Sequence, residues 1–178
     1  MLTIPPGLRS RSIQLGVTLV EMLIALAVLA VLLGIAAPSF RTFLANTAVR
    51  STAESLYQGF QLARAEAVRQ NARVRLVVSN DTSWVVQTDT GVNIESKPAR
   101  EGTGGFVTIA VTPTAAATIT FNSFGRVTAN ADGSNSITQI DFSSANGTMT
   151  RRLVFGVTSG GLLCDPSITT AGDPRKCP

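Results

Sequence analysis

The chain has 178 residues, enough for one domain and an appendage, and 44% of them are hydrophobic, a high fraction for a purely soluble protein. Its formal charge of +4 falls by two if Arg9 and Arg11 are removed with the N-terminal end, so charge argues only weakly for an anionic partner. Histidine is absent, which excludes His-based triads, His general bases and nearly every common zinc site.

Residues 17–37 form an almost unbroken apolar run that follows a basic leader. As an α-helix this run would span about 30 Å, which matches the hydrocarbon core of a bilayer. An ordinary secretory signal has an apolar core of only about 7–15 residues. By the positive-inside rule, Arg9 and Arg11 keep the leader in the cytoplasm. The sequence therefore predicts one transmembrane helix, with the rest of the chain exported.

Glu21 is a charged residue inside this apolar run. A carboxylate among lipid tails costs a few kcal/mol, so it indicates a function and needs a partner. Its position near the start of the run eases the cost, because it can reach the headgroup region. The alternative interpretation is a plain membrane anchor with an incidental glutamate near the interface.

The stretch Gly16-Val17-Thr18-Leu19-Val20-Glu21 resembles the N-terminal signature of the type IV pilins and the pseudopilins of type II secretion. That signature is a basic leader ending in Gly, then an apolar helix with Glu at its fifth position. The resemblance implies that a prepilin peptidase cuts between Gly16 and Val17 and methylates the new N-terminus, although Phe is usual where Val17 stands. It also implies that Glu21 pairs with the N-terminal amine of a neighbouring subunit and so sets the register of helices in a filament.

A helical pattern resumes after Pro38, which is expected to kink or locally break the helix. Apolar residues recur at spacings of four and three and predict an amphipathic helix that ends near Gln70 or Asn71: Val49, Ala53, Leu56, Phe60, Ala63 and Ala67. We interpret this stripe as packing against a sheet rather than as a separate binding face. Gly59 costs roughly 1 kcal/mol inside a helix, which suggests that it admits a closely packed strand.

From residue 73 the hydrophobic period becomes two, which is typical of strands. Strands are expected within residues 73–79, 83–88, 105–112, 117–124, 137–144 and 150–157. The first two flank Asn80-Asp81-Thr82 and predict a hairpin, and residues 91–105 are expected to form a long polar connection. The fold class is therefore α+β, a long N-terminal helix packed on a C-terminal antiparallel β-sheet or on two sheets.

Four parts follow from these patterns: a leader at 1–16, a transmembrane and assembly helix at 17–37, an amphipathic helix at 38–71 and a β-rich domain at 72–178. Cys164 and Cys177, the only cysteines, predict a disulfide in an exported chain, the alternative being two free thiols in a cytosolic one.

The stretch "FNSFGRV" at 121–127 and the C-terminal "CDP…CP" resemble the GspH minor pseudopilins and the FimT/FimU-type minor pilins. This resemblance implies a structural subunit that resides in the bacterial inner membrane with a periplasmic head, is processed by prepilin peptidase, and joins other pilins in a type IV pilus or a type II secretion pseudopilus. It does not separate the two machines. A simple membrane-anchored periplasmic domain is a rival interpretation.

Candidate chemistry is sparse. Asp89 and Asp141 are candidates for a carboxylate pair, but isolated acids in strands and turns are usually solvated. The segment 102–105 lacks the lysine of a phosphate loop, and the turn 130–135 has too few carboxylates to hold calcium. We therefore expect no enzyme activity, no cofactor and no metal site.

DNA capture is the remaining alternative. FimT-type DNA-binding minor pilins carry a Gly-Arg-x-Arg motif near the C-terminus, whereas residues 159–163 here contain no arginine. The candidate DNA-binding cations that remain are Arg126, Arg151, Arg152, Arg175 and Lys176. Neighbours in a strand point to opposite faces, so Arg151 and Arg152 are not expected to share one patch. DNA is therefore not the favoured partner.

Overall fold

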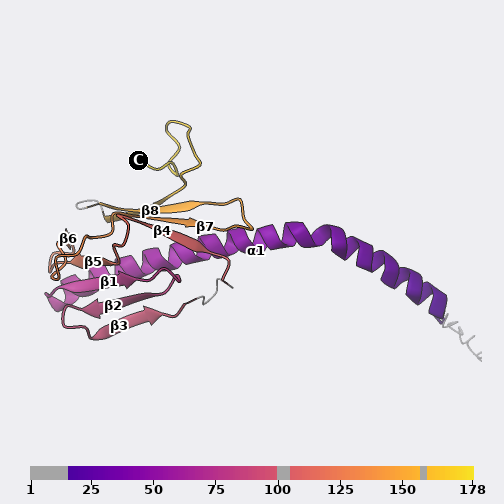
Figure 1. The fold of residues 1–178 in the computed structure, drawn as a ribbon, viewed down its shortest axis with the longest axis horizontal. Coiled ribbons are helices and arrows are strands. Elements are labelled where there is room, and N and C mark those ends of the chain that lie inside the picture. The colour runs from indigo at the N-terminus through magenta and orange to yellow at the C-terminus, as the bar shows by residue number, and fades with distance from the viewer. Residues whose placement is uncertain (1–15, 100–104, 157–159) are drawn as a thin grey trace, which may run out of the picture. The chain divides into compact units, whose positions relative to one another are not determined.

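The computed structural model describes residues 16–99, 105–156 and 160–178 (Figure 1). The chain divides into two compact units, Met1–Pro38 and Ser39–Pro178. One helix, α1 (Leu19–Gln70), contributes to both. It contains Pro38, so the local break expected at this proline does not occur, and its end at Gln70 agrees with the sequence prediction.

In the first unit, α1 begins after a capping residue. Thr18 accepts two hydrogen bonds, one at its backbone carbonyl from the N–H of Met22 (3.1 Å) and one at its side-chain Oγ1 from the N–H of Glu21 (3.2 Å). A threonine in this position satisfies N–H groups that have no partner within the helix. α1 is the one helix among the described residues that is long and apolar enough to cross a membrane.

The second unit holds two antiparallel sheets packed against α1 (Figure 1). The first has the order β3 (Asn93–Lys97), β2 (Trp84–Thr88), β1 (Val74–Val78), β5 (Thr118–Phe121) and β6 (Val127–Thr128). The second has the order β4 (Thr108–Thr112), β7 (Gln139–Ser143), β8 (Arg151–Gly156) and β9 (Gly160–Cys164). The α+β class is confirmed, in its two-sheet form.

Three strands were not expected from the sequence. β3 lies inside the segment 91–105 that was predicted to be a polar connection, so that prediction is wrong in part. β3 is an edge strand whose register against β2 shifts between Val86 and Gln87. β6 has only two residues, and β9 begins with two glycines.

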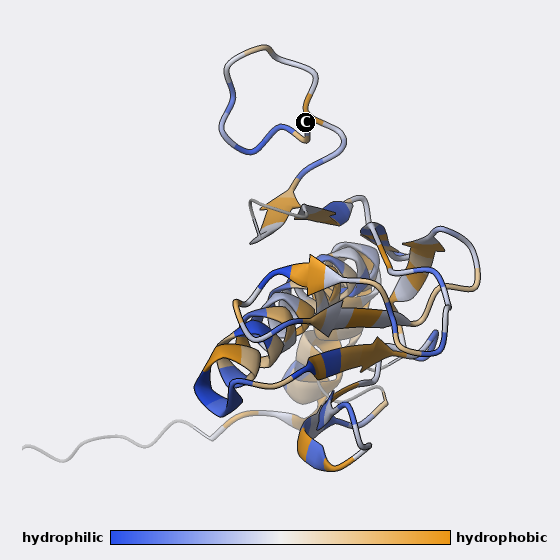
Figure 2. Cartoon of the chain, turned by 90° about the vertical axis from the view of Figure 1, so that its left-hand side faces the viewer, coloured by the Kyte–Doolittle hydropathy of each residue, from blue (hydrophilic) through white to orange (hydrophobic). Residues whose placement is uncertain are grey.

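The predicted apolar stripe of α1 forms the centre of the core. All six of its residues are buried, and with the inner faces of both sheets they form one apolar cluster. The centroid of the Phe60 ring lies 5.0 Å from the ring centroid of Phe121 on β5, in an edge-to-face arrangement. It also lies 5.0 Å from the ring centroid of Phe155 on β8. Phe60 therefore joins the two sheets through the helix. Figure 2 shows the strands beside the helix and the C-terminal loop standing away from them.

Gly59 allows close packing of a side chain from β2. A Cβ at this position would lie 3.0 Å from Cε3 of Trp84. The Trp84 indole N–H donates to Oγ of Ser55 (3.2 Å), which fixes the ring across the helix. The sequence prediction of a close-packed strand here is confirmed, and the indole ring is the part of the strand that makes the contact.

Candidate assembly segment and the cations of the head

The junction between Gly16 and Val17 lies outside the helix in exposed backbone. Val17 is 64% exposed, and, apart from its chain neighbours, no described residue has an atom within 4 Å of where a Cβ on Gly16 would stand. Because α1 begins only at Leu19, the peptide bond between Gly16 and Val17 is not held in helical hydrogen bonds. The arrangement suits access by a peptidase.

Glu21 lies in the first turn of α1 and is exposed. No ion pair involves it within the described residues. A carboxylate in a first turn interacts favourably with the helix dipole, and the spacing Thr18-x-x-Glu21 is that of a capping box. Sequence reasoning missed the cap that Thr18 provides here, although a threonine three residues before a glutamate was the readable signal.

The apolar side chains that follow Glu21 are exposed all round the helix. Each is at least half exposed: Met22, Leu23, Ile24, Leu26, Val28, Leu29, Val31, Leu32, Leu33 and Ile35. A helix that is apolar on every face is stable in lipid or among other apolar helices, not in water.

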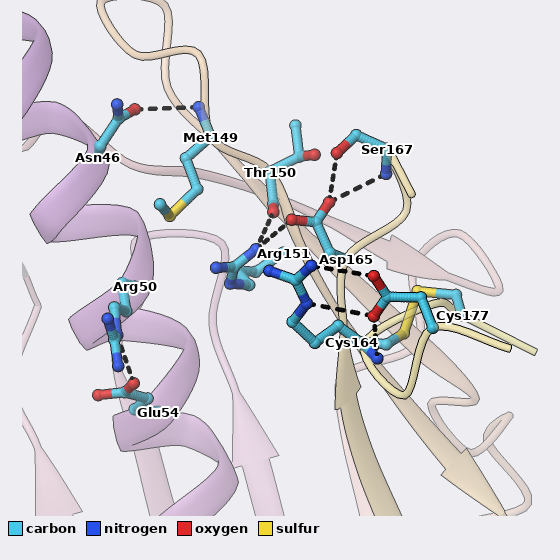
Figure 3. A network of polar contacts seen from close by, with 12 residues as sticks. Asn46, Arg50, Glu54, Met149, Thr150, Arg151, Cys164, Asp165, Ser167 and Cys177 are labelled. Carbon is cyan, nitrogen blue, oxygen red and sulfur yellow. Dashed lines mark hydrogen bonds and ion pairs between the residues drawn. A yellow bond between two sulfur atoms is a disulfide. The ribbon is translucent and has the colours of Figure 1, made fainter. Parts of the chain in front are cut away.

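Cys164 and Cys177 form a disulfide, as the sequence predicted. The bond closes the C-terminal loop, and the N–H of Asp165 donates to the carbonyl of Arg175 (2.7 Å) beside it. The Asp165 carboxylate accepts hydrogen bonds from the N–H and Oγ of Ser167 and from Arg151 on β8 (Figure 3). Burial works to raise the pKa of Asp165, but these hydrogen bonds outweigh it and hold the pKa below its usual value.

The candidate DNA-binding cations of β8 and the C-terminal loop have partners of their own. Arg151 pairs with Asp165 (2.5 Å), Arg152 with Asp141 across β7 and β8 (2.6 Å), and Arg175 with Asp173 (2.9 Å). Lys176 donates to the carbonyl of Thr169 (3.2 Å). Arg151 and Arg175 line one hollow together with Arg50 and Glu54 of α1, while Arg152 is directed at Asp141 instead. Arg126 and Lys176 are the members of the full candidate set with no carboxylate partner among the described residues, and Arg126 also has no side-chain hydrogen bond there.

Asp89 and Asp141, the acids considered as a carboxylate pair, lie at different sheets. Asp141 on β7 holds Arg152, whereas Asp89 follows β2 in the other sheet, with its Oδ2 4.0 Å from Arg73. The turn 130–135 is organised by Asn130, which is buried and accepts a hydrogen bond from Thr120 (2.8 Å). Residues 102–104 lie outside the described ranges. Within those ranges, no cluster of three or more acidic or cysteine side chains offers a metal site.

Comparison with known proteins agrees with this arrangement. Residues 11–37 match the prokaryotic N-terminal methylation motif, and residues 52–161, more than half of the chain, match the family described as Type II transport protein GspH. No curated protein matches the chain.

Among solved structures, the chain is similar to the type IV minor pilin FimU of Pseudomonas aeruginosa strain PAO1 in two crystal forms. The first has 19% identity and a TM-score of 0.50 over 67% of this chain and 90% of FimU. The second has 18% identity and a TM-score of 0.48 over 67% and 94%. The first likeness shows a shared pilin fold, one long N-terminal helix on antiparallel sheets. With its methylation motif and its match to the GspH domain, the chain belongs to the type IV pilin-like GspH/FimT family.

Proposed function

We propose that this minor pilin or pseudopilin is held in the bacterial inner membrane by residues 17–37, is cut after Gly16 by a prepilin peptidase, and then enters a filament through α1. The observation that supports this most is the start of α1. An exposed Gly16–Val17 junction precedes a helix that is apolar all round and has a carboxylate in its first turn.

The proposed role of Glu21 is to pair with the new N-terminal amine of a neighbouring subunit. Cleavage would place a positive charge at Val17, next to the positive end of the α1 dipole. Within one helix that amine is poorly placed, and in an apolar bundle each charge is costly alone. A neighbour whose helix is shifted along the axis brings amine and carboxylate together, so the pair selects one register.

The remaining parts take their roles from this scheme. The leader 1–16 is the segment removed, residues 17–37 are the membrane and assembly helix, and residues 38–71 carry the stripe on which the domain 72–178 folds. The head is proposed to be periplasmic, where its disulfide is stable. Its role is structural, as is that of its family, and its partners are other pilins or pseudopilins.

Processing is tested by intact-mass measurement of the full chain expressed with and without a prepilin peptidase. The expected result is loss of the first 16 residues only when the peptidase is present. Gly16→Leu should block the cut, because a side chain then stands at the cleavage site. Gly34→Leu is the matched control, since no atom lies within 4 Å of a Cβ there either, and it should be cut normally. An uncut wild-type chain in the presence of active peptidase would contradict the proposal.

A further inference from the structure

We propose that Arg64, Val68, Phe124 and Arg126, called here the distal patch, form a docking surface for a segment of another protein that carries a carboxylate beside an apolar side chain. The patch lies where the last turns of α1 meet the turn between β5 and β6. The identification of the partner as a further filament subunit rests on the proposed function. The chemistry of the surface is independent of it.

The aromatic side chain of the patch is held outward by a rigid turn. Phe124 is 80% exposed, the highest value among the exposed large apolar residues. Asn122 fixes the turn, because its Oδ1 accepts from the N–H of Phe124 (3.0 Å) and of Arg126 (3.1 Å). Its carbonyl also accepts from the N–H of Gly125 (2.9 Å). Because the backbone of the turn is already ordered, only the two side-chain torsions of Phe124 remain to be fixed when a partner covers it.

The turn is also seated on the helix. Gly125 has φ +69°, and a Cβ there would lie 3.0 Å from Cγ2 of Val68 and 3.1 Å from Cγ of Arg64. Only glycine suits both the backbone angle and the space. The contact joins Phe124 and Arg126 to the two α1 residues of the patch as one surface.

The arginines of the patch differ from most of the other arginines that the structure describes. Of these ten arginines, six have a carboxylate oxygen within 4.0 Å: Arg50, Arg69, Arg73, Arg151, Arg152 and Arg175. Arg64 and Arg126 have no such partner within the described parts of the chain, and neither have Arg41 and Arg75. Both line one hollow of about 180 Å³, which Phe124 also borders. Two arginines that line one small hollow and carry no carboxylate partner complement an acidic side chain placed there.

The surface beside the hollow is apolar. Val68 is 53% exposed and forms, with Ala65, the floor of a shallow depression on α1. Arginine and aromatic residues around an apolar centre are the composition that carries binding energy at protein interfaces. Nucleic acid would need a row of cations for successive phosphates and several aromatic rings for stacking, and the patch has neither. The observations therefore favour a protein segment.

The test is photocrosslinking in cells that make the full filament system, with p-benzoyl-phenylalanine in place of Phe124 in the full-length chain. The expected product is a crosslink to one protein segment that, by mass spectrometry, has an Asp or Glu within a few residues of the attachment point. Arg64→Gln with Arg126→Gln should lower the yield roughly tenfold, the effect of losing charge-assisted hydrogen bonds. Replacing the partner's acid with Lys should restore crosslinking to an Arg126→Glu variant.

Two controls keep the result specific. Arg69→Gln removes a nearby arginine that is already paired with Glu66 and should leave the yield unchanged. The same crosslinker at Val92 should not give this product. Val92 is 63% exposed and directly precedes β3, at the opposite edge of the first sheet from β6. The proposal would be overturned by a crosslink to nucleic acid or to a protein segment without an acid. It would also be overturned if the double variant crosslinked as strongly as the wild type, or if no crosslink formed. The mass of the same protein reports leader removal, so a cut chain without a crosslink rejects the patch alone, and an uncut chain rejects the proposed function.

Discussion

The amide oxygen of Asn46 on α1 lies so close to Gly147 that position 147 has no room for a side chain. A Cβ on Gly147 would stand 2.6 Å from Oδ1 of Asn46 and 3.3 Å from Cβ of Ala45. The same oxygen accepts hydrogen bonds from the N–H groups of Thr148 and Met149, each 2.9 Å long. The loop between β7 and β8 is thus fastened to the helix by one side chain.

Asn46→Ala should therefore destabilise the head by about 1 to 2 kcal/mol, because two backbone N–H groups lose their acceptor. Asn46→Asp keeps an oxygen in place and should cost less. Gly147→Ala should destabilise at least as much as Asn46→Ala, since the new methyl forces the loop away. Chemical denaturation of the full chain in detergent, followed by circular dichroism, measures the three values. Equal stability of Asn46→Ala and wild type would contradict the prediction.

Gly59→Ala should destabilise the protein although alanine is the better helix former by about 1 kcal/mol. The added methyl would stand 3.0 to 3.1 Å from three ring carbons of Trp84, and the ring must shift. In a Trp84→Leu background the clash is relieved, so the same substitution should become neutral or stabilising. The sign change is measured as a double-mutant cycle of unfolding free energies. The same sign in both backgrounds would show that the indole ring does not set the packing.

Glu21→Gln separates the two roles available to this residue. Glutamine can still serve a capping box but carries no charge. If the carboxylate pairs with a neighbour's amine, Glu21→Gln and Glu21→Val should both insert into the membrane and both fail to enter filaments. Thr18→Ala removes the cap and leaves the charge, so it should assemble far better than either. Measured incorporation into sheared filaments decides, and normal assembly of Glu21→Gln would limit the residue to capping.

Acid should loosen the C-terminal loop through Asp165. The folded-state pKa of this carboxyl is held below its usual value near 3.8, so its contribution to stability is present above about that pH and is lost as the pH falls through the lower folded value. The destabilisation caused by Asp165→Asn should thus be largest at neutral pH and vanish in strong acid. Ser167→Ala removes one hydrogen bond and should move the loss to higher pH. A pH-independent effect of Asp165→Asn would argue against this linkage.

Duplex DNA should bind the full chain no more tightly than roughly micromolar at physiological salt, the range of non-specific phosphate contact. Arg151, Arg152 and Arg175 each already hold an aspartate, which offsets their positive charge toward phosphates. The affinity is measured by fluorescence titration of DNA with the wild-type chain and with the Arg151→Ala, Arg152→Ala double variant. Clearly sub-micromolar binding that the double variant loses would make DNA capture the primary function.

The helix and the first hairpin could be predicted because each has a strong hydrophobic period. The stripe from Val49 to Ala67 matches the period of an α-helix, and β1 and β2 alternate on either side of a short turn. β3 could not be found in this way, because Ile94 is its only large apolar residue and an edge strand needs no buried alternation. The hydrophobic period of a strand shows which of its residues are buried, but it does not show which other strand pairs with it. The sequence therefore could not distinguish one sheet from two.

At the candidate sites, the residues close in sequence were readable and those brought together by the fold were not. Gly16, Val17 and Glu21 follow one local pattern. The pairing of Arg152 with Asp141 depends on the register of β7 against β8, which no sequence spacing reveals. The distal patch likewise depends on the fold, which brings residue 64 close to the turn that holds residue 126. The sequence marked Arg126 as a candidate cation but did not mark Arg64.

The position of the buried stripe within α1 also has a consequence for the order in which the head folds. The ten buried residues of α1 emerge before any strand that covers them. β1 can pair with β2 as soon as the hairpin is made. Its other neighbour is β5, with Val74 opposite Phe121, so the first sheet stays incomplete until the later segment that holds β5 is available. During this interval the stripe is an exposed apolar surface, and contact with other chains competes with folding. If the head is exported as proposed, slowing export of the segment that holds β5 should raise aggregation of the head more than slowing export of the C-terminal loop.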